Sequence, residues 1–179
     1  QGVSSAASDV YKRQIENYDT IKKQLLAQGH RFSSDTDTEV LACLIQQCWE
    51  GNLEDAVIAA LRMVEGTYGI AVVSSRDPEK VVGARKGSPL LVGIGDGQTY
   101  LASDASAILA HTRDVVYLDE GEIAVLTPSG YRIMDIDAAP VRRSVETIAW
   151  DLDAIERGGY DHFMLKELSL IHISEPTRR

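Results

Sequence analysis

The sequence predicts an α+β protein with antiparallel sheets. Amphipathic helices come first, and the segments after them alternate apolar and polar residues with a period of two. The connections between the later strands are short and rich in Gly, Pro, Asp and Ser, which is typical of strands that run antiparallel to their neighbours. Because helices and strands are clustered along the chain and do not alternate, the pattern indicates α+β rather than a parallel α/β sheet.

The first part of the chain is expected to form three helices. Apolar residues recur at spacings of three and four, which places them on one face of each helix. Gly29 and Gly51 are expected to follow the first two helices, since glycine is favoured just past a helix C-terminus. The expected helices are 17–28, 37–49 and a third that starts after the cap Asn52 and is closed by Gly66.

The period of two begins after these helices. Asp96-Gly97 is expected to form a type I′ hairpin, because this dipeptide accepts positive φ. Further turns are expected at 76–79, 119–121 and 128–130. The expected strands are 67–74, 80–85, 90–95, 98–102, 115–118, 122–127 and 131–135, and the expected short helices are 104–111 (capped by Ser103), 151–157 and 160–168.

Composition limits the classes of function. The chain has 179 residues, 44% of them hydrophobic and 25% charged, which is typical of one globular domain. Its formal net charge of −9 argues against nucleic acid or an anionic membrane as a partner. No apolar run approaches the roughly 18 residues that span a bilayer.

The cysteines and histidines do not predict a metal site. Cys43 and Cys48 fall in one expected helix, and we interpret them as core thiols of a reducing compartment. None of the histidines has a second ligand at the spacing of a zinc site. The histidines are His30, His111, His162 and His172.

The polar stretch 33–40 (Ser-Ser-Asp-Thr-Asp-Thr-Glu-Val) is the candidate site. Thr36 and Glu39 match a capping box, and Asp37 suits the positive end of the helix dipole. Capping is the favoured interpretation, but it does not explain why Asp35 and Asp37 both lie at one helix start. An exposed carboxylate here could instead hold the ammonium group of a ligand.

Six segments of the sequence resemble one family in order and spacing. They are Ile15-Glu16-Asn17, 34–40, Gly66-Thr67-Tyr68-Gly69, 84–90, Ala102-Ser103-Asp104 and 162–167. Together they resemble the glutaminase domain of the glucosamine-6-phosphate synthases (glutamine–fructose-6-phosphate aminotransferases, isomerizing). The resemblance covers residues 15–167 and implies that they are the C-terminal part of that domain, so the fold is expected to be truncated at its N-terminus. Residues 1–14 are expected to be a foreign leader and residues 168–179 a foreign tail.

The resemblance implies a fold and a reaction. The fold is the αββα sandwich of the N-terminal nucleophile hydrolases, with two antiparallel sheets between helical layers. In the reaction, an N-terminal cysteine attacks the side-chain amide of L-glutamine, an Asn-Gly pair stabilises the oxyanion, and ammonia passes to a domain that acts on fructose 6-phosphate. The resemblance also implies a cytoplasmic parent enzyme, a homodimer that needs no cofactor.

One ligand contact of the family is present. Asp37 matches the aspartate that holds the α-ammonium of glutamine, and we assign no catalytic role to any residue. The positions of the family's oxyanion pair are Lys12 and Arg13. Since neither the nucleophile nor this pair is found, the chain by itself is expected to lack glutaminase activity. The alternatives are another class II amidotransferase, such as an amidophosphoribosyltransferase, or a non-catalytic acidic interaction module.

Overall fold

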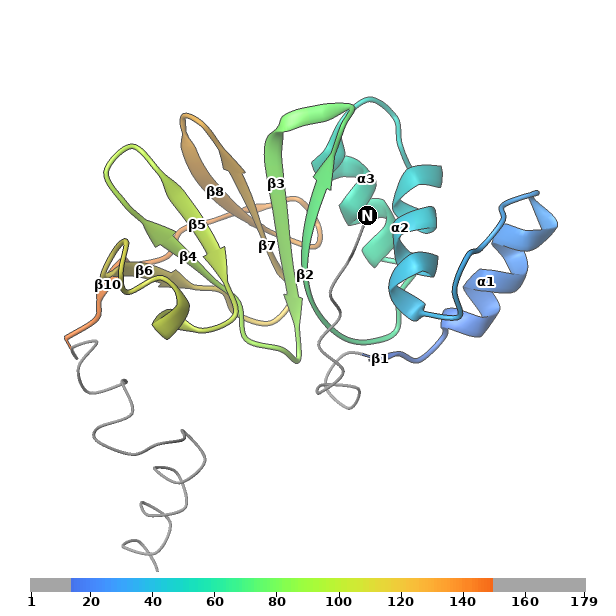
Figure 1. Cartoon of the computed structure of the whole chain (residues 1–179), viewed down its shortest axis with the longest axis horizontal. Coiled ribbons are helices and arrows are strands. Elements are labelled where there is room, and N and C mark those ends of the chain that lie inside the picture. The colour runs from blue at the N-terminus through green and yellow to red at the C-terminus, as the bar shows by residue number, and fades with distance from the viewer. Residues whose placement is uncertain (1–13, 150–179) are drawn as a thin grey trace, which may run out of the picture.

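The computed structural model describes residues 14–149 (Figure 1). The helices expected at 151–157 and 160–168 lie outside the described residues, as do the expected tail and all of the expected leader except Gln14. Gln14 belongs to the first strand.

The three expected helices are confirmed, and two of them have the expected caps. The side chain of Asn52 accepts a hydrogen bond from the backbone N of Glu54, and the side chain of Thr36 accepts one from Glu39. The third helix is shorter than expected, because the chain turns after Leu61 and Gly66, at φ 116°, already belongs to a strand. The helices are α1 (Tyr18–Ala27), α2 (Asp37–Gln47) and α3 (Leu53–Leu61).

The strands form two sheets in which all neighbouring strands are antiparallel, as predicted. The six-stranded sheet has the order β1 (Gln14–Ile15), β2 (Gly66–Ser74), β3 (Asp77–Lys86), β7 (Glu122–Thr127), β8 (Gly130–Asp135) and β9 (Pro140–Val141). The four-stranded sheet has the order β10 (Glu146–Thr147), β6 (Asp114–Tyr117), β4 (Leu91–Ile94) and β5 (Thr99–Ala102).

Three turn predictions need correction. The hairpin after β2 turns at residues 75–76, since Asp77 already pairs with Ser74, and not at 76–79. The 95–98 hairpin is not type I′, because Gly97 has positive φ and Asp96 does not. The helix expected at 104–111 is the 3₁₀ turn η1 (Ala105–Ala107), and its cap is the Asp104 carboxylate, not Ser103.

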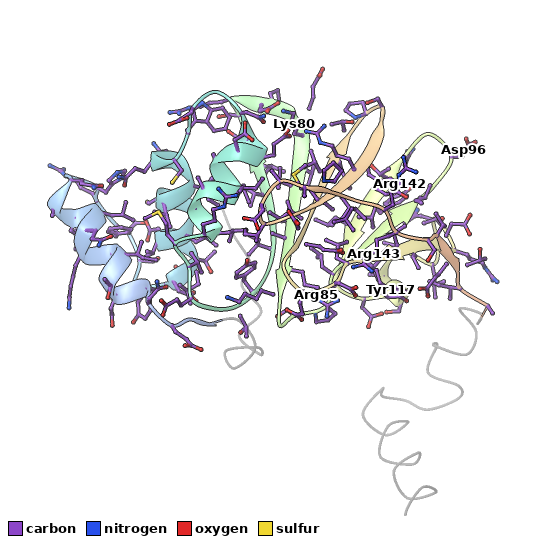
Figure 2. All side chains as sticks on the ribbon, turned by 180° about the vertical axis from the view of Figure 1, so that it is seen from behind. Lys80, Arg85, Asp96, Tyr117, Arg142 and Arg143 are labelled. Carbon is purple, nitrogen blue, oxygen red and sulfur yellow. The ribbon has the colours of Figure 1, made fainter. Side chains whose placement is uncertain are left out.

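The connection at 119–121 was expected to join neighbouring antiparallel strands, and this was wrong. It joins β6 of one sheet to β7 of the other. Arg85 lies at this crossover, donating to the carbonyl of Leu118 and lying 3.4 Å from the Glu120 carboxylate (Figure 2). Arg143 donates from Nε to Glu122 at 2.9 Å. Polar side chains also satisfy backbone groups at this crossover: Arg85 binds the Leu118 carbonyl, and Glu122 Oε2 accepts from the backbone N of Asp119 at 2.7 Å.

Apolar clusters on both faces of the sheets produce the layers seen in Figure 1. One cluster lies between the helices and the six-stranded sheet and includes Leu25, Val57 and Val82. A second lies between the two sheets and includes Val92 and Leu118. Helices, six-stranded sheet and four-stranded sheet therefore stack in that order, which confirms the predicted α+β sandwich.

Candidate functional site

The loop before α2 is held in place by the carboxylate of Glu39. Its Oε1 accepts from the backbone N and the hydroxyl of Ser33, both at 2.8 Å. Its Oε2 accepts from the backbone N of Ser34 at 2.7 Å and from the hydroxyl at 2.6 Å. Only half of the predicted capping box is therefore formed: Thr36 Oγ1 accepts from the Glu39 backbone at 3.3 Å, but the backbone N of Thr36 donates to Ser34 Oγ at 3.4 Å.

These bonds have an electrostatic consequence. The hydroxyl of Ser34, followed by the backbone and hydroxyl of Ser33, favours the ionised form of Glu39 and lowers its pKa to about 2. Glu39 therefore stays charged and keeps the loop closed on the start of α2 across the physiological range.

The two aspartates at the start of α2, Asp35 and Asp37, bind different partners. The Asp35 carboxylate lies 2.8 Å from the ammonium of Lys22 on α1, and this contact lowers the pKa of Asp35. The Lys22 ammonium also lies 5.4 Å from the centre of the Phe32 ring. This ion pair connects the loop to α1 and gives Asp35 a role that differs from that of Asp37, although both acids lie at the start of α2.

Asp37 is half-buried at the first position of α2. Its Oδ2 accepts from the backbone N of Ile15 at 3.2 Å, and its Oδ1 accepts from the Thr38 hydroxyl at 3.4 Å. The carboxylate lines a pocket of about 220 Å³ between α2 and the start of β2. The residues that line this pocket, called here the Asp37 pocket, are Ile15, Asp37, Thr38, Leu41, Thr67, Tyr68, Gly69, Ile70 and Ala71.

Asp37 is the single charged group among these lining residues. Its remaining lone pairs and its negative charge, close to neutral and apolar walls, suit a small cationic group such as an ammonium. The sequence predicted a ligand contact for Asp37 but no role for Thr67-Tyr68-Gly69. The bond from the backbone of Ile15 to Asp37 could not be predicted, because no sequence signal marks a bond between residues 22 positions apart.

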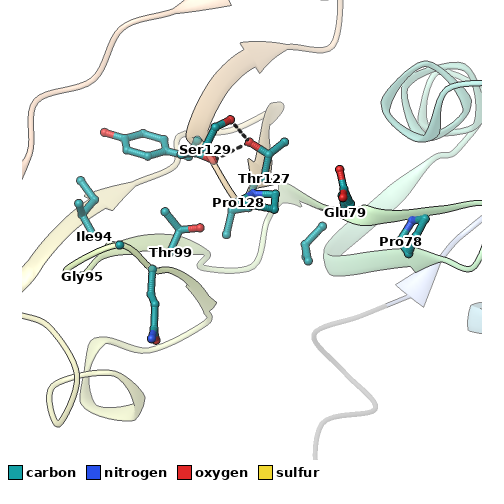
Figure 3. Close-up of a pocket in the computed structure, with 14 residues that line it drawn as sticks. Pro78, Glu79, Ile94, Gly95, Thr99, Thr127, Pro128 and Ser129 are labelled. Carbon is teal, nitrogen blue, oxygen red and sulfur yellow. Dashed lines mark hydrogen bonds between the residues drawn. The ribbon is translucent and has the colours of Figure 1, made fainter.

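A larger pocket of about 680 Å³ lies at the other end of the sheets, between the β4–β5 and β7–β8 hairpins (Figure 3). The charged group among its described lining residues is Glu79. Thr127 Oγ1 lies 2.9 Å from Ser129 Oγ and 3.2 Å from the carbonyl of Gly130, so these hydroxyls stabilise the turn. The hydroxyls of Thr127 and Ser129 bind each other and a backbone carbonyl rather than a base, so the described lining of this pocket does not resemble a catalytic site.

The cysteines are free, partly buried thiols that pack against the helix–sheet core, which confirms the packing expected from sequence, while the reducing compartment stays a prediction. Burial raises the pKa of both Cys43 and Cys48, the opposite of what a nucleophilic thiol requires. Within residues 14–149 no cluster of three or more metal-binding side chains is found. Of the helices described, none is long and apolar enough to cross a membrane.

Comparison with known proteins places the chain among amidotransferases. A family model described as "Glutamine amidotransferase domain" matches residues 4–110, a match that begins within the segment expected to be a leader. The chain is 48% identical over 170 residues to a glutamine–fructose-6-phosphate aminotransferase (isomerizing) of Chlorobaculum tepidum. It is 51% identical over 156 residues to the one of Methanothermobacter thermautotrophicus. These alignments cover 93% and 86% of this chain but only 28% and 26% of the relatives.

The fold of this chain is also similar to that of two solved structures. The glutamine phosphoribosylpyrophosphate amidotransferase of B. subtilis, complexed with ADP and GMP, has a TM-score of 0.58 at 28% identity, covering 70% of this chain and 28% of that one. An allosteric regulatory enzyme of purine biosynthesis has the same TM-score at 26% identity, covering 67% and 26%. This likeness confirms the predicted N-terminal nucleophile sandwich, of which residues 14–149 form both sheets and one helical layer. With more than half of its residues matched, the chain belongs to the glutamine amidotransferase domain family.

Proposed function

We propose that this chain is the glutaminase portion of an amidotransferase that hydrolyses L-glutamine and transfers the ammonia to fructose 6-phosphate, giving glucosamine 6-phosphate and glutamate. The support is the identity of 48% and 51% with two glutamine–fructose-6-phosphate aminotransferases. The domain would span residues 15–167 between flanks 1–14 and 168–179, in a cytoplasmic, homodimeric parent enzyme.

Within this function, Asp37 binds the α-ammonium of glutamine. The observation that supports this role is the half-buried Asp37 carboxylate in a pocket without another charged lining residue. Asp37 is the first residue of α2, where a negatively charged side chain stabilises a helix through its dipole. A charge-assisted hydrogen bond to an ammonium is worth about 1.5–3 kcal/mol, or roughly one to two orders of magnitude in affinity.

A second candidate is an amidophosphoribosyltransferase, since the similar solved structure from B. subtilis is a glutamine phosphoribosylpyrophosphate amidotransferase. Its identity of 28% is well below the 48% of the fructose-6-phosphate enzyme. Both candidates use glutamine, so a test of glutamine binding at Asp37 applies to either of them. The same test separates both from a non-catalytic interaction module. The ammonia acceptor is tested with the parent enzyme, by comparing fructose 6-phosphate with phosphoribosyl pyrophosphate.

The test is an NMR titration of the full chain with L-glutamine. It follows the amide of Ile15, which donates to the Asp37 carboxylate, and the amide of Thr38, whose hydroxyl donates to the same carboxylate. We expect saturable shifts that glutaramate, which is glutamine without its α-amino group, does not produce. Asp37→Asn keeps the shape and removes the charge, so it should weaken binding roughly tenfold or more. Asp35→Asn is the matched control, since Asp35 pairs with Lys22.

Two outcomes contradict this role for Asp37. Equal shifts with glutaramate and glutamine would show that the α-ammonium is not recognised. Equal affinity of Asp37→Asn and the unmodified chain, or no response to glutamine at millimolar concentration, would show that this carboxylate does not bind the ligand.

A further inference from the structure

The start of β2 forms one wall of the Asp37 pocket. Thr67, Tyr68 and Gly69 all line this pocket, and they are called here the β2 wall. The helix α2, which carries Asp37, forms the facing wall. A ligand whose ammonium group binds Asp37 would therefore lie against the β2 wall, so the position of this wall decides how closely the ligand fits.

The bend after β3 packs closely against the β2 wall. Gly87 has a φ of 78°, and a Cβ added to it would lie 2.6 Å from Thr67 Cγ2 and 2.9 Å from Thr67 Cβ. A Cβ added to Gly69 would lie 2.9 Å from the Cβ of Ser88. Gly87 also forms an isolated parallel bridge with Tyr68. A shift of residues 87 and 88 would therefore be transmitted to the whole β2 wall.

The carboxylate of Glu120 holds this bend. Its Oε2 accepts from the backbone N of Gly87 at 2.7 Å, and its Oε1 lies 3.4 Å from Nη2 of Arg85. Arg85 is itself held at the crossover between β6 and β7. It donates to the carbonyl of Leu118, and its own carbonyl accepts from the backbone N of Gly121 at 3.0 Å. The position of the bend is therefore set by the crossover, which is 33 positions away in sequence.

We propose that Glu120 is a positioning residue for the Asp37 pocket. By holding the backbone N of Gly87, it keeps the β2 wall at the distance from Asp37 that the ligand requires. This inference rests on the proposed function, in which the ligand is L-glutamine. Glu120 is not among the described residues that line the pocket, so it acts through the bend and not by contact with the ligand.

The hydrogen bond to Gly87 carries this role better than the ion pair with Arg85. The side chain of Glu120 is 60% exposed, and exposed ion pairs contribute little to stability. A backbone N–H that donates to an ionised carboxylate forms a stronger bond than one that donates to a neutral acceptor. The negative charge of Glu120 also contributes, after burial, to the raised pKa of Tyr68, in agreement with a carboxylate close to the β2 wall.

Glu120 could affect glutamine binding through this hydrogen bond or through its charge, which would attract an ammonium group without positioning anything. Two variants separate these effects. Glu120→Gln removes the charge but keeps a side-chain carbonyl oxygen that can accept from Gly87, whereas Glu120→Ala removes both. If Glu120 acts by positioning, Glu120→Gln should behave like the unmodified chain and Glu120→Ala should not.

The first measurement is made on the full chain without ligand. The amide NMR signals of residues 67–69 report the position of the β2 wall. We expect Glu120→Ala to shift these signals and Glu120→Gln to leave them close to their original positions. The matched control is Glu79→Ala, because Glu79 is an exposed glutamate at the other end of the sheets, and it should leave the signals unchanged.

The second measurement is the titration of the same variants with L-glutamine. Glu120→Ala should weaken binding roughly fivefold or more, while Glu120→Gln and Glu79→Ala should stay within about twofold of the unmodified chain. A residue that only stabilised the fold would lower the urea midpoint without changing the affinity of the folded chain. Glu120→Asp keeps the charge but is too short to reach Gly87, so it should weaken binding in the same way and replaces Glu120→Ala if that variant does not fold.

Three results would overturn the positioning role. They are unchanged signals of residues 67–69 in Glu120→Ala, equal affinity of Glu120→Ala and the unmodified chain, and an equal loss of affinity in Glu120→Gln and Glu120→Ala, which would assign the effect to charge. If the unmodified chain did not bind L-glutamine, the proposed function would fail, whereas the signals measured without ligand would still decide whether Glu120 positions the β2 wall.

Discussion

Replacing Leu118 by alanine tests the packing of the two sheets on each other. Leu118 is fully buried between them, at 0% exposure, with Val92 and Leu126 in the same cluster. The backbone bond from Leu118 to the carbonyl of Leu90, at 3.1 Å, does not involve the side chain and would remain. The substitution therefore isolates the loss of apolar contact between the sheets.

The expected magnitude follows from the atoms removed. Three carbon groups at about 0.8 kcal/mol each give about 2.4 kcal/mol for transfer from water. The cavity adds to this, because rigid strands on both sides relax only partly, and buried Leu→Ala changes cost about 3–5 kcal/mol in total. We expect Leu118→Ala to lower the free energy of unfolding by about 3–4 kcal/mol.

Urea denaturation measures this change. With a slope of about 2 kcal/mol/M, the midpoint should fall by roughly 1.5–2 M. The matched control is Leu26→Ala on α1, the same chemical change at a side chain that is 51% exposed. It should cost less than about 1 kcal/mol. If both variants shifted the midpoint equally, the two sheets would not be packed face to face as described.

Two further predictions concern local structure. Because the folded pKa of Glu39 is lowered to about 2, its stabilisation of the 33–36 loop is complete above the ordinary glutamate pKa and is lost as pH falls toward 2. Glu39→Gln should abolish this pH dependence, measured by NMR titration of the serine amides, and a titration near pH 4.5 in the unmodified chain would contradict it. Gly87→Ala should cost about 2–3 kcal/mol in urea denaturation, since φ is 78° and the new Cβ would lie 2.6 Å from Thr67 Cγ2. Gly97→Ala, at φ 66° with open space around it, should cost only about 1 kcal/mol, and equal losses would exclude the steric contribution.

Much of the candidate site could be predicted from sequence, but its geometry could not. The helix start at Asp37 and the cap Thr36 follow from residue types at fixed spacing, and the structure has both. The role of Asp35 did not follow, because Lys22 is 13 positions away on another helix. The Glu39 carboxylate was assigned to Thr36 and instead binds Ser33 and Ser34, since two hydroxyls and two amides together offer more hydrogen bonds than one amide.

The sequence by itself determined the features that depend on neighbours within a few residues. Helical faces, caps and strands such as β7 and β8 follow from periodicity and local hydrogen bonding. Only the tertiary structure decided that β6 and β7 belong to different sheets, and that Ile15 comes to Asp37. The physical reason is that a strand is covered on both faces and paired at its edges by segments distant in sequence. The choice among possible partners therefore depends on burial of the whole sandwich rather than on any local pattern.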